Sequence, residues 1–218
     1  METTFHTHPS LPPLKWRLGR RSITKLAVSS LDNNVYLIDT EVGMVVIDAA
    51  DDVDAITTLI GAAPLAAIIT THRHHDHIRA LSALSSYYPQ AALYAGEDDV
   101  EAIYDATGIR PRAVKDGEIL TFGSLSLNAI CLVGHTPGSI ALACQEGENS
   151  SIFTGDSLFP GGVGKTNSAQ DFTSLLNDVI DKIFNRFDDM TIVHPGHGDA
   201  TTLGRERPYL EQWRQRGW

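Results

Sequence analysis

Four of the nine histidines in this 218-residue chain fall within six positions, and an aspartate lies among them. The pattern is H-x-H-x-D-H and comprises His72, His74, Asp76 and His77. Imidazole nitrogens and carboxylate oxygens together are ligands for Zn²⁺, Fe²⁺ or Mn²⁺. In an extended segment His72 and His74 project to the same side, whereas His75 turns outward. The alternative is a solvated loop in which Asp76 only caps a helix. The density of ligand types favours a metal site.

Three further segments share one plan, in which an apolar run ends in a glycine turn and then in a residue that can bind a metal. These runs, at residues 129–133, 151–154 and 191–193, lead to His135, Asp156 and His197. In layered α/β folds, ligands collect beyond the carboxyl ends of strands. One histidine after a strand is usually structural, and His194 is expected to be so. The joint occurrence of these residues with the histidine-rich loop predicts one convergent site.

The elements that must position these residues alternate along the first half of the chain. Apolar and β-branched runs indicate strands at residues 23–30, 35–39, 44–48, 66–70 and 91–95. Helical spacing and end signals indicate helices at residues 51–61, from the histidine-rich loop to about 88, and 97–107. The histidine-rich loop is therefore expected to connect a buried strand to a helix.

The second half repeats this arrangement. Strands are indicated at residues 118–122, 125–133, 140–145, 152–154 and 191–193, with the longest helical pattern at 168–187 and a terminal helix at 204–218. No linker rich in proline, glycine or serine separates the halves. The order predicts an α/β fold in which two sheets pack together with helices outside. We expect a single domain of two similar halves over residues 21–218, preceded by an N-terminal tail over residues 1–20.

The composition narrows the class of protein. The formal net charge is −10, from 17 basic and 27 acidic residues, which argues against binding to a nucleic-acid backbone. No apolar run reaches the length of a membrane span, and the first 13 residues do not resemble a targeting segment. Two cysteines, Cys131 and Cys144, are too few for a disulfide framework. We expect a cytoplasmic protein that acts on a small molecule; the composition does not indicate an oligomeric state.

These motifs, in this order over about residues 20–200, resemble those of the metallo-β-lactamase superfamily. The resemblance implies a four-layer αββα sandwich, in which two mixed β-sheets are flanked by helices. It also implies two divalent metal ions in one cleft, with Zn²⁺ favoured and Fe or Mn as alternatives. The implied ligands are His72, His74 and His135 for the first ion, Asp76, His77 and His197 for the second, and Asp156 as a bridge.

The resemblance further implies a hydrolase in which a metal-bridging hydroxide attacks a thioester, ester or lactone. Asp76 is the candidate for general acid and base catalysis. Asp156 stands where the antibiotic-degrading members have cysteine, which disfavours penicillin hydrolysis. The strings at residues 134–139 and 155–166 are similar to those of the glyoxalase II branch, and residues 201–207 resemble the tail of its short, single-domain members. Lys165 matches a cation of that branch and could bind a substrate carboxylate, although a solvated lysine fits the loop nearly as well.

Two other functions compete with this hypothesis. One is a mononuclear iron persulfide dioxygenase that uses only His72, His135 and Asp156. The other is a non-catalytic binding protein, which the complete ligand set disfavours because desolvated imidazoles are costly to retain. The sequence also departs from the family pattern, since residues 78–80 are Ile-Arg-Ala where x-Gly-Gly is usual. Only 21 residues follow His197, so the helical C-terminal domain of full-length glyoxalase II is not expected.

Overall fold

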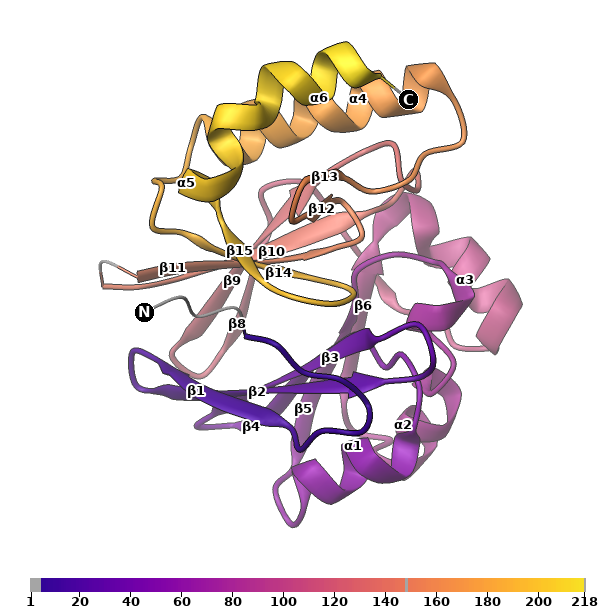
Figure 1. Ribbon diagram of the computed structural model, residues 1–218. Helices are drawn as coiled ribbons and strands as arrows, with labels where there is room; N and C mark the ends of the chain where they lie inside the picture. The colour runs from indigo at the N-terminus through magenta and orange to yellow at the C-terminus, as the bar shows by residue number, and fades with distance from the viewer. Residues whose placement is uncertain (1–4, 148, 218) are drawn as a thin grey trace.

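Two mixed β-sheets pack against each other in the centre of the molecule, and helices cover both outer faces (Figure 1). The computed structural model describes residues 5–147 and 149–217. The purple first half of the chain forms one sheet with its helices, and the pink to yellow second half forms the other (Figure 1). The predicted α/β, four-layer αββα arrangement is therefore confirmed.

The first sheet contains seven strands that lie side by side in chain order. They are β1 (Leu14–Leu18), β2 (Arg21–Val28), β3 (Asn33–Thr40), β4 (Gly43–Ile47), β5 (Leu65–Thr70), β6 (Ala92–Gly96) and β7 (Arg112–Val114). Strands β1 to β4 form an antiparallel meander, whereas β4 to β7 run parallel. Parallel neighbours require crossover connections, and helices lie in these connections: α1 (Val53–Ile60), α2 (Leu81–Tyr87) and α3 (Val100–Thr107). Single turns η1 (His75–His77) and η2 (Glu97–Asp99) precede α2 and α3.

The second sheet has the order β15-β14-β11-β10-β9-β8. Its strands are β8 (Ile119–Phe122), β9 (Leu125–Cys131), β10 (Ile140–Glu146), β11 (Asn149–Gly155), β14 (Ile192–Pro195) and β15 (Thr201–Thr202). A small hairpin, β12 (Leu158–Phe159) and β13 (Gly162–Val163), follows β11. The helices of this half are α4 (Ala169–Val179), η3 (Ile180–Phe184), α5 (Leu203–Glu206), η4 (Arg207–Tyr209) and α6 (Leu210–Arg216). Strand β11 pairs in parallel with β14, so the carboxyl ends of both strands reach the same edge.

Three apolar clusters hold the four layers together. One lies between the two sheets and includes Ile47, Leu127 and Phe153. A second joins the first sheet to helices α1, α2 and α3, and a third joins the second sheet to α4 and α6. The regular 3- and 4-residue spacing of apolar side chains in α4 explains the third cluster, because it places them on one face of the helix. The sheets are thus fixed relative to each other by a buried interface.

The differences from the prediction concern short or irregular elements. Residues 14–18, which were expected in the tail, form β1, and Trp16 packs against the core between the sheets. Residues 1–4 of that tail lie outside the described residues. The helical pattern at 168–187 divides into α4 and a π-helical turn, and the terminal helix divides into α5, η4 and α6. Within the described part of the chain, no helix is long and apolar enough to cross a membrane.

Candidate metal centre

The histidine-rich loop begins where the central parallel strand β5 ends. Both His72 and His77 are buried, His74 is half-buried, and His75 is exposed as the side-chain alternation predicted. Asp76 and His77 belong to the single turn η1, in which His77 N donates to His74 O and the following Ile78 N donates to His75 O. This tight turn reverses the chain, so side chains on either side of it face one another.

The second half brings its residues to the same place from three strand ends. The loop after β9 carries His135, the residue after β11 is Asp156, and the loop after β14 carries His197. The backbone joins these loops to the first sheet, since Ile140 N donates to Thr71 O at 2.9 Å and Asn34 N donates to Gly196 O at 2.7 Å. The seven residues predicted from the sequence therefore lie together around one centre.

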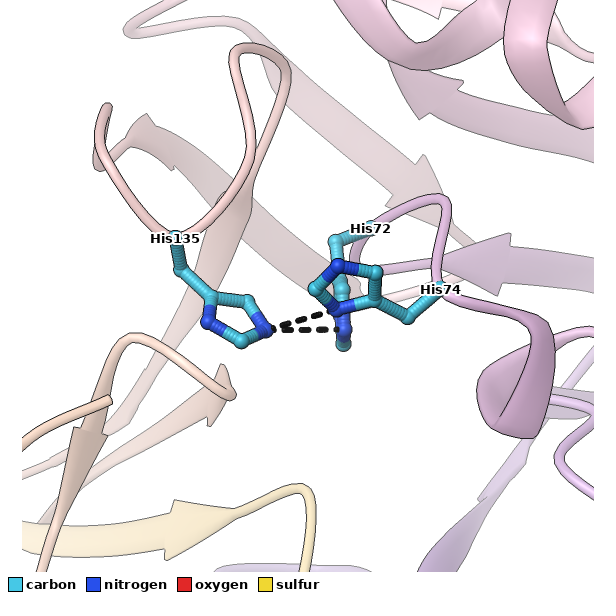
Figure 2. A group of neighbouring side chains, drawn as sticks. All are labelled: His72, His74 and His135. Carbon is cyan, nitrogen blue, oxygen red and sulfur yellow. Dashed lines mark hydrogen bonds between the residues drawn. The ribbon is translucent and has the colours of Figure 1, made fainter. Parts of the chain in front are cut away.

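The first group consists of His72, His74 and His135, which point toward one another across the cleft (Figure 2). His135 Nε2 lies 2.9 Å from His74 Nδ1 and 3.3 Å from His72 Nε2. Nitrogens bound to zinc at about 2.0–2.1 Å in a tetrahedron are about 3.3 Å apart. The spacing of these three nitrogens thus fits a single cation.

A second group consists of Asp76, His77 and His197. His197 Nε2 lies 3.1 Å from His77 Nε2 and 3.3 Å from Asp76 Oδ2, and His77 Nε2 lies 3.7 Å from the same oxygen. The mixture of nitrogen and oxygen donors suits Zn²⁺, Fe²⁺ or Mn²⁺. These distances also fit one cation.

Asp156 lies between the two groups. Its Oδ2 is 4.0 Å from His72 Nε2, 3.5 Å from His135 Nε2 and 3.4 Å from His197 Nε2. Its Oδ1 is buried without a hydrogen bond, 3.4 Å from His77 Nε2. A buried carboxylate oxygen without a donor is costly unless a cation compensates it. Asp156 is thus placed to contact cations in both groups.

Glycine is required where the chain approaches Asp156. A Cβ on Gly196 would lie 2.3 Å from Asp156 Oδ1 and 2.7 Å from the His77 ring. Only glycine permits this close approach. The glycine turns that the sequence showed before each second-half residue therefore have a steric role at this position.

The opposite ring nitrogens of four histidines are held by hydrogen bonds. His135 Nδ1 donates to the carbonyl of Lys165 at 2.6 Å, and His197 Nδ1 donates to the carbonyl of Leu31 at 2.7 Å. These carbonyls fix the proton on Nδ1 and leave Nε2 with its lone pair toward the cleft. In the first half, Thr71 Oγ1 and Asp48 Oδ2 hold the Nδ1 atoms of His72 and His77.

Asp48 is the common partner in the first half. It is buried at the end of β4, and its Oδ2 accepts from Thr71 Oγ1 at 2.7 Å and from His77 Nδ1 at 2.9 Å. Thr71 Oγ1 in turn lies 3.0 Å from His72 Nδ1, and Thr71 N donates to Asp48 Oδ1 at 2.7 Å. Asp48 has a positive φ of 59°, a region that aspartate and asparagine tolerate better than most residues. One carboxylate thus orients a histidine of each group.

Asp99 joins the loop of the first half to that of the second. Its side chain is fully buried. Its Oδ2 accepts from Arg73 N at 3.0 Å and from Thr136 Oγ1 at 2.6 Å, and its Oδ1 accepts from Gly138 N at 3.1 Å. Arg73 lies between two histidines of the first loop, and Thr136 follows His135. Asp99 therefore sets the distance between the two loops that form the first group.

Neither Asp48 nor Asp99 was among the residues predicted for the site. Asp48 ends an apolar strand, as Asp156 follows one, so the same pattern could have revealed it. Asp99 sits in an acidic run typical of a helix start, and the sequence there contains no signal for its contacts. Asn33, the first residue of β3, was likewise not predicted for the site, and it donates to Asp76 Oδ2 at 3.0 Å.

The electrostatics of the cleft follow from burial and close charges. Burial, followed by the charge of His77, holds the pKa of His72 well below its ordinary value. Burial would lower the pKa of His77, but Asp156 and Asp48 raise it to about 10. Burial would raise the pKa of Asp156, but His197 and His77 hold it well below its usual range. A cation that binds to His77 must therefore displace a proton.

The remaining predicted residues have distinct surroundings. Lys165 is exposed and lines a hollow with Phe172 and Arg216, while its carbonyl holds His135. His194 is buried between aromatic rings, including those of Trp16 and Phe153. This burial lowers its pKa to about 3. This is the structural environment expected for it.

The unusual Ile-Arg-Ala segment is accommodated without glycine. Ile78 is buried in the cluster under α1 and α2, and Ala80 N donates to Ala49 O at 3.0 Å. Arg79 turns outward, and its Nη1 donates to Asp51 at 3.1 Å. The side chains of this segment thus point away from the two ligand groups.

Comparisons with known proteins agree with this geometry. A family model described as the metallo-beta-lactamase superfamily matches residues 30–201. Hydroxyacylglutathione hydrolase GloC of Haemophilus influenzae is 28% identical over 214 residues, which cover 87% of this chain and 98% of that relative. Among solved structures, the BLEG-1 B3 metallo-beta-lactamase has a TM-score of 0.71 at 26% identity, covering 85% of this chain and 96% of that chain. TTHA1623 in a di-iron-bound form has a TM-score of 0.69 at 30% identity, covering 84% and 96%.

Proposed function

This chain belongs to the metallo-β-lactamase superfamily, and we propose that it is a dinuclear metal hydrolase that cleaves a thioester, ester or lactone. The observation that carries the proposal is the position of Asp156, whose carboxylate lies 3.4–4.0 Å from a nitrogen of four different histidines. Such a carboxylate can serve both cation groups at once. The similarity to a hydroxyacylglutathione hydrolase supports a thioester as the first substrate to test.

The first ion would be held by His72, His74 and His135, the second by Asp76, His77 and His197, and Asp156 would contact both. When bound, two such ions supply a water of lowered pKa and polarise the carbonyl that is attacked. Zn²⁺ is our first candidate. Iron is a direct alternative because the similar TTHA1623 was solved in a di-iron-bound form, and manganese has a suitable ligand set.

Asp76 is the residue that we propose to accept and return protons. Its Oδ2 faces His77 and His197 and accepts a hydrogen bond from Asn33 Nδ2 at 3.0 Å. Burial raises the pKa of Asp76, but the hydrogen bond from Asn33 and the charge of His77 lower it by more than burial raises it. The net shift is downward, so the carboxylate is ionised at neutral pH. An ionised, oriented carboxylate can take a proton from an attacking water and deliver it to the leaving group.

Neighbouring residues shape the space in which the acyl group would lie. The ring of Phe159 in β12 is centred 6.4 Å from the ring of His197. We propose that this half-buried ring covers the second group from solvent, where it would exclude water other than the nucleophile. A small-molecule substrate and a cytoplasmic location remain predictions from the sequence.

The proposal is tested by a substrate panel combined with metal analysis. The panel contains S-lactoylglutathione, an acyl-homoserine lactone, nitrocefin and glutathione persulfide, and metals are measured on protein purified without added metal. We expect two metal ions per chain and the highest kcat/KM for the thioester or the lactone. One iron per chain with turnover of the persulfide would instead establish a dioxygenase. Two metals with nitrocefin as the best substrate would establish a β-lactamase.

A further inference from the structure

A hollow of about 260 Å³ opens directly beside the first ligand group. Its lining includes His135, Arg73 and Asn167, together with Pro137 and Asp171. His135 is thus shared between the ligand group and the hollow. A substrate whose reacting carbonyl lies at the ligand groups can extend into this space.

Arg73 supplies the positive charge of this hollow. Its backbone N donates to Asp99 Oδ2 at 3.0 Å, and its Nε lies 3.6 Å from Asp99 Oδ1. Its side chain is 38% exposed, and among the described residues its two terminal nitrogens have no hydrogen-bond partner. Asp99 therefore fixes the base of the guanidinium, while the planar end remains open to a ligand.

The other polar groups of the hollow define what it can bind. Asp171 is the single acidic side chain in its lining within the described chain, and its Oδ2 accepts a hydrogen bond from Ser168 Oγ at 2.8 Å. Asn167 directly precedes that serine and offers an amide. A guanidinium end with two N–H donors matches a carboxylate, which it binds through two parallel hydrogen bonds.

Lys165, the cation that the sequence suggested for this role, lines a separate hollow of about 230 Å³ with Phe172 and Arg216. None of the seven proposed ligands lines that hollow. Its carbonyl, not its ammonium group, contacts His135. Between the two cations, Arg73 alone shares a hollow with a residue of the ligand groups.

We propose that Arg73, assisted by Asn167, binds a carboxylate carried by the substrate and so determines specificity. The inference rests on the proposed hydrolase function. It predicts a preference for thioesters whose thiol portion bears a carboxylate a few atoms from the sulfur. Arg73 is thereby a substrate-binding residue, and Asp99 positions it.

A matched pair of thioesters tests the proposal by kinetics. S-acetyl-3-mercaptopropionate carries the carboxylate, and S-acetyl-3-mercaptopropionamide is its uncharged analogue. We expect Arg73→Gln to raise KM for the carboxylate substrate by about 10-fold, because a hydrogen bond to a charged group is lost. The kcat/KM for the amide should be unchanged, and Arg73→Lys should restore part of the preference. An equal effect on both substrates, or none on either, would overturn the proposal.

Two further variants assign the effect to the correct cation. Arg79→Gln removes the same charge six residues away, from a side chain that faces Asp51, and should retain the parental preference. Lys165→Gln tests the competing cation directly. If Lys165→Gln abolishes the carboxylate preference and Arg73→Gln does not, Arg73 has been assigned wrongly.

Binding measured without turnover separates this inference from the proposed reaction. Isothermal titration calorimetry of the zinc-loaded protein would compare 3-(methylthio)propionate with 3-(methylthio)propionamide. We expect tighter binding of the carboxylate by about 10-fold in the parent and no difference in Arg73→Gln. A preference that survives in Arg73→Gln would show that the metal holds the carboxylate, which contradicts the proposal. Failure to hydrolyse either thioester would count against thioester cleavage but leave this binding result interpretable.

Discussion

The two halves of the molecule supply the candidate metal centre in different ways. The first half contributes four residues from six consecutive positions of one loop, and Asp48 of the same half orients two of them. The second half contributes His135, Asp156 and His197 from three separate strand ends. A local loop can hold its geometry through its own hydrogen bonds. A distributed set depends on the packing of the whole sheet and on contacts with the other half.

The geometry of the metal centre therefore depends on contacts between the two halves. Asp99 connects the histidine-rich loop to the loop of His135. Asn34 and Lys25 bond to the backbone carbonyl of Gly198, next to His197. Each second-half histidine is thus held by residues of the first half. Loss of such a contact should weaken the centre without removing a ligand.

The largest effect is expected from the residue that touches both ligand groups. Asp156→Ala should lower the metal content from two ions to less than one per chain and reduce kcat/KM by about 1,000-fold or more. Asp76→Asn should remove only the second ion and reduce kcat by about 100-fold or more, because a proton acceptor is lost. Metal content is measured by mass spectrometry on protein purified in parallel.

The comparison between Asp156→Ala and Asp76→Asn shows which residue couples the two ligand groups. Thermal unfolding of both metal-free variants should remain cooperative, as a control for folding. Equal loss of both ions in Asp76→Asn would show that the local loop, not Asp156, couples the two groups. Parental turnover in Asp76→Asn would remove Asp76 from catalysis.

The next effect concerns the contact between the halves. Asp99→Asn should weaken binding at the His72, His74 and His135 group by about 10- to 100-fold, the usual cost of losing an outer partner of a metal ligand. Competition with a chromophoric chelator measures the affinity. Asp98→Asn changes an exposed neighbour and serves as the matched control. An unchanged zinc affinity in Asp99→Asn would mean that the two loops hold their spacing without it.

A smaller effect is expected inside the first half. Asp48→Asn keeps the positive φ of residue 48, which asparagine tolerates. It replaces one acceptor oxygen and removes the charge that faces His77. We expect about a 10-fold weaker second ion, measured by the same competition, with the exposed Asp39→Asn as the control. If zinc binds to Asp48→Asn as tightly as to the parent, the loop is held by its backbone alone.

The smallest effect is a pH dependence of stability that arises at Lys25. Burial lowers the pKa of Lys25 from 10.5 to about 8, so between these values the unfolded chain binds the proton that the folded chain has released. The contribution of Lys25 to stability therefore rises with pH in this window, by about 1 kcal/mol between pH 7.5 and 9. Urea unfolding of metal-free protein measures it. The stability of the parent relative to Lys25→Met should rise with pH by this amount, whereas the stability of the parent relative to the exposed-lysine control Lys15→Met should stay constant.

An identical pH dependence in Lys25→Met and in the parent would assign the effect to other groups. A stability difference between the parent and Lys25→Met that falls with pH would contradict the sign of the lowered pKa.

Much of the fold was predictable because the apolar patterns agree with the elements. The strand at 66–70, the helix at 51–61 and the long helical pattern after Ser168 are all present at nearly the predicted bounds. The elements that were missed are two to five residues long, such as β1 and β15, and are too short to show a period. Strand β1 exists because Trp16 and its neighbours pair with β2, a contact that depends on tertiary structure.

The site residues of the two halves were predicted from different kinds of sequence signal. The spacing of His72, His74, Asp76 and His77 is itself the signal. His135, Asp156 and His197 were found only because each follows a strand and a glycine. The partners that hold them are invisible in the sequence. Asp99 looks like an ordinary helix start, and the carbonyl groups of Lys165 and Leu31 belong to the backbone, so residue type does not reveal them.

Crystals of the protein grown with zinc, with anomalous diffraction collected above and below the zinc absorption edge, test the central claim most directly. The account predicts two anomalous peaks about 3.5–4 Å apart, one among His72, His74 and His135 and one among Asp76, His77 and His197, with Asp156 in contact with both. A single peak at the first group, or zinc bound elsewhere while both groups remain without a peak, would contradict it.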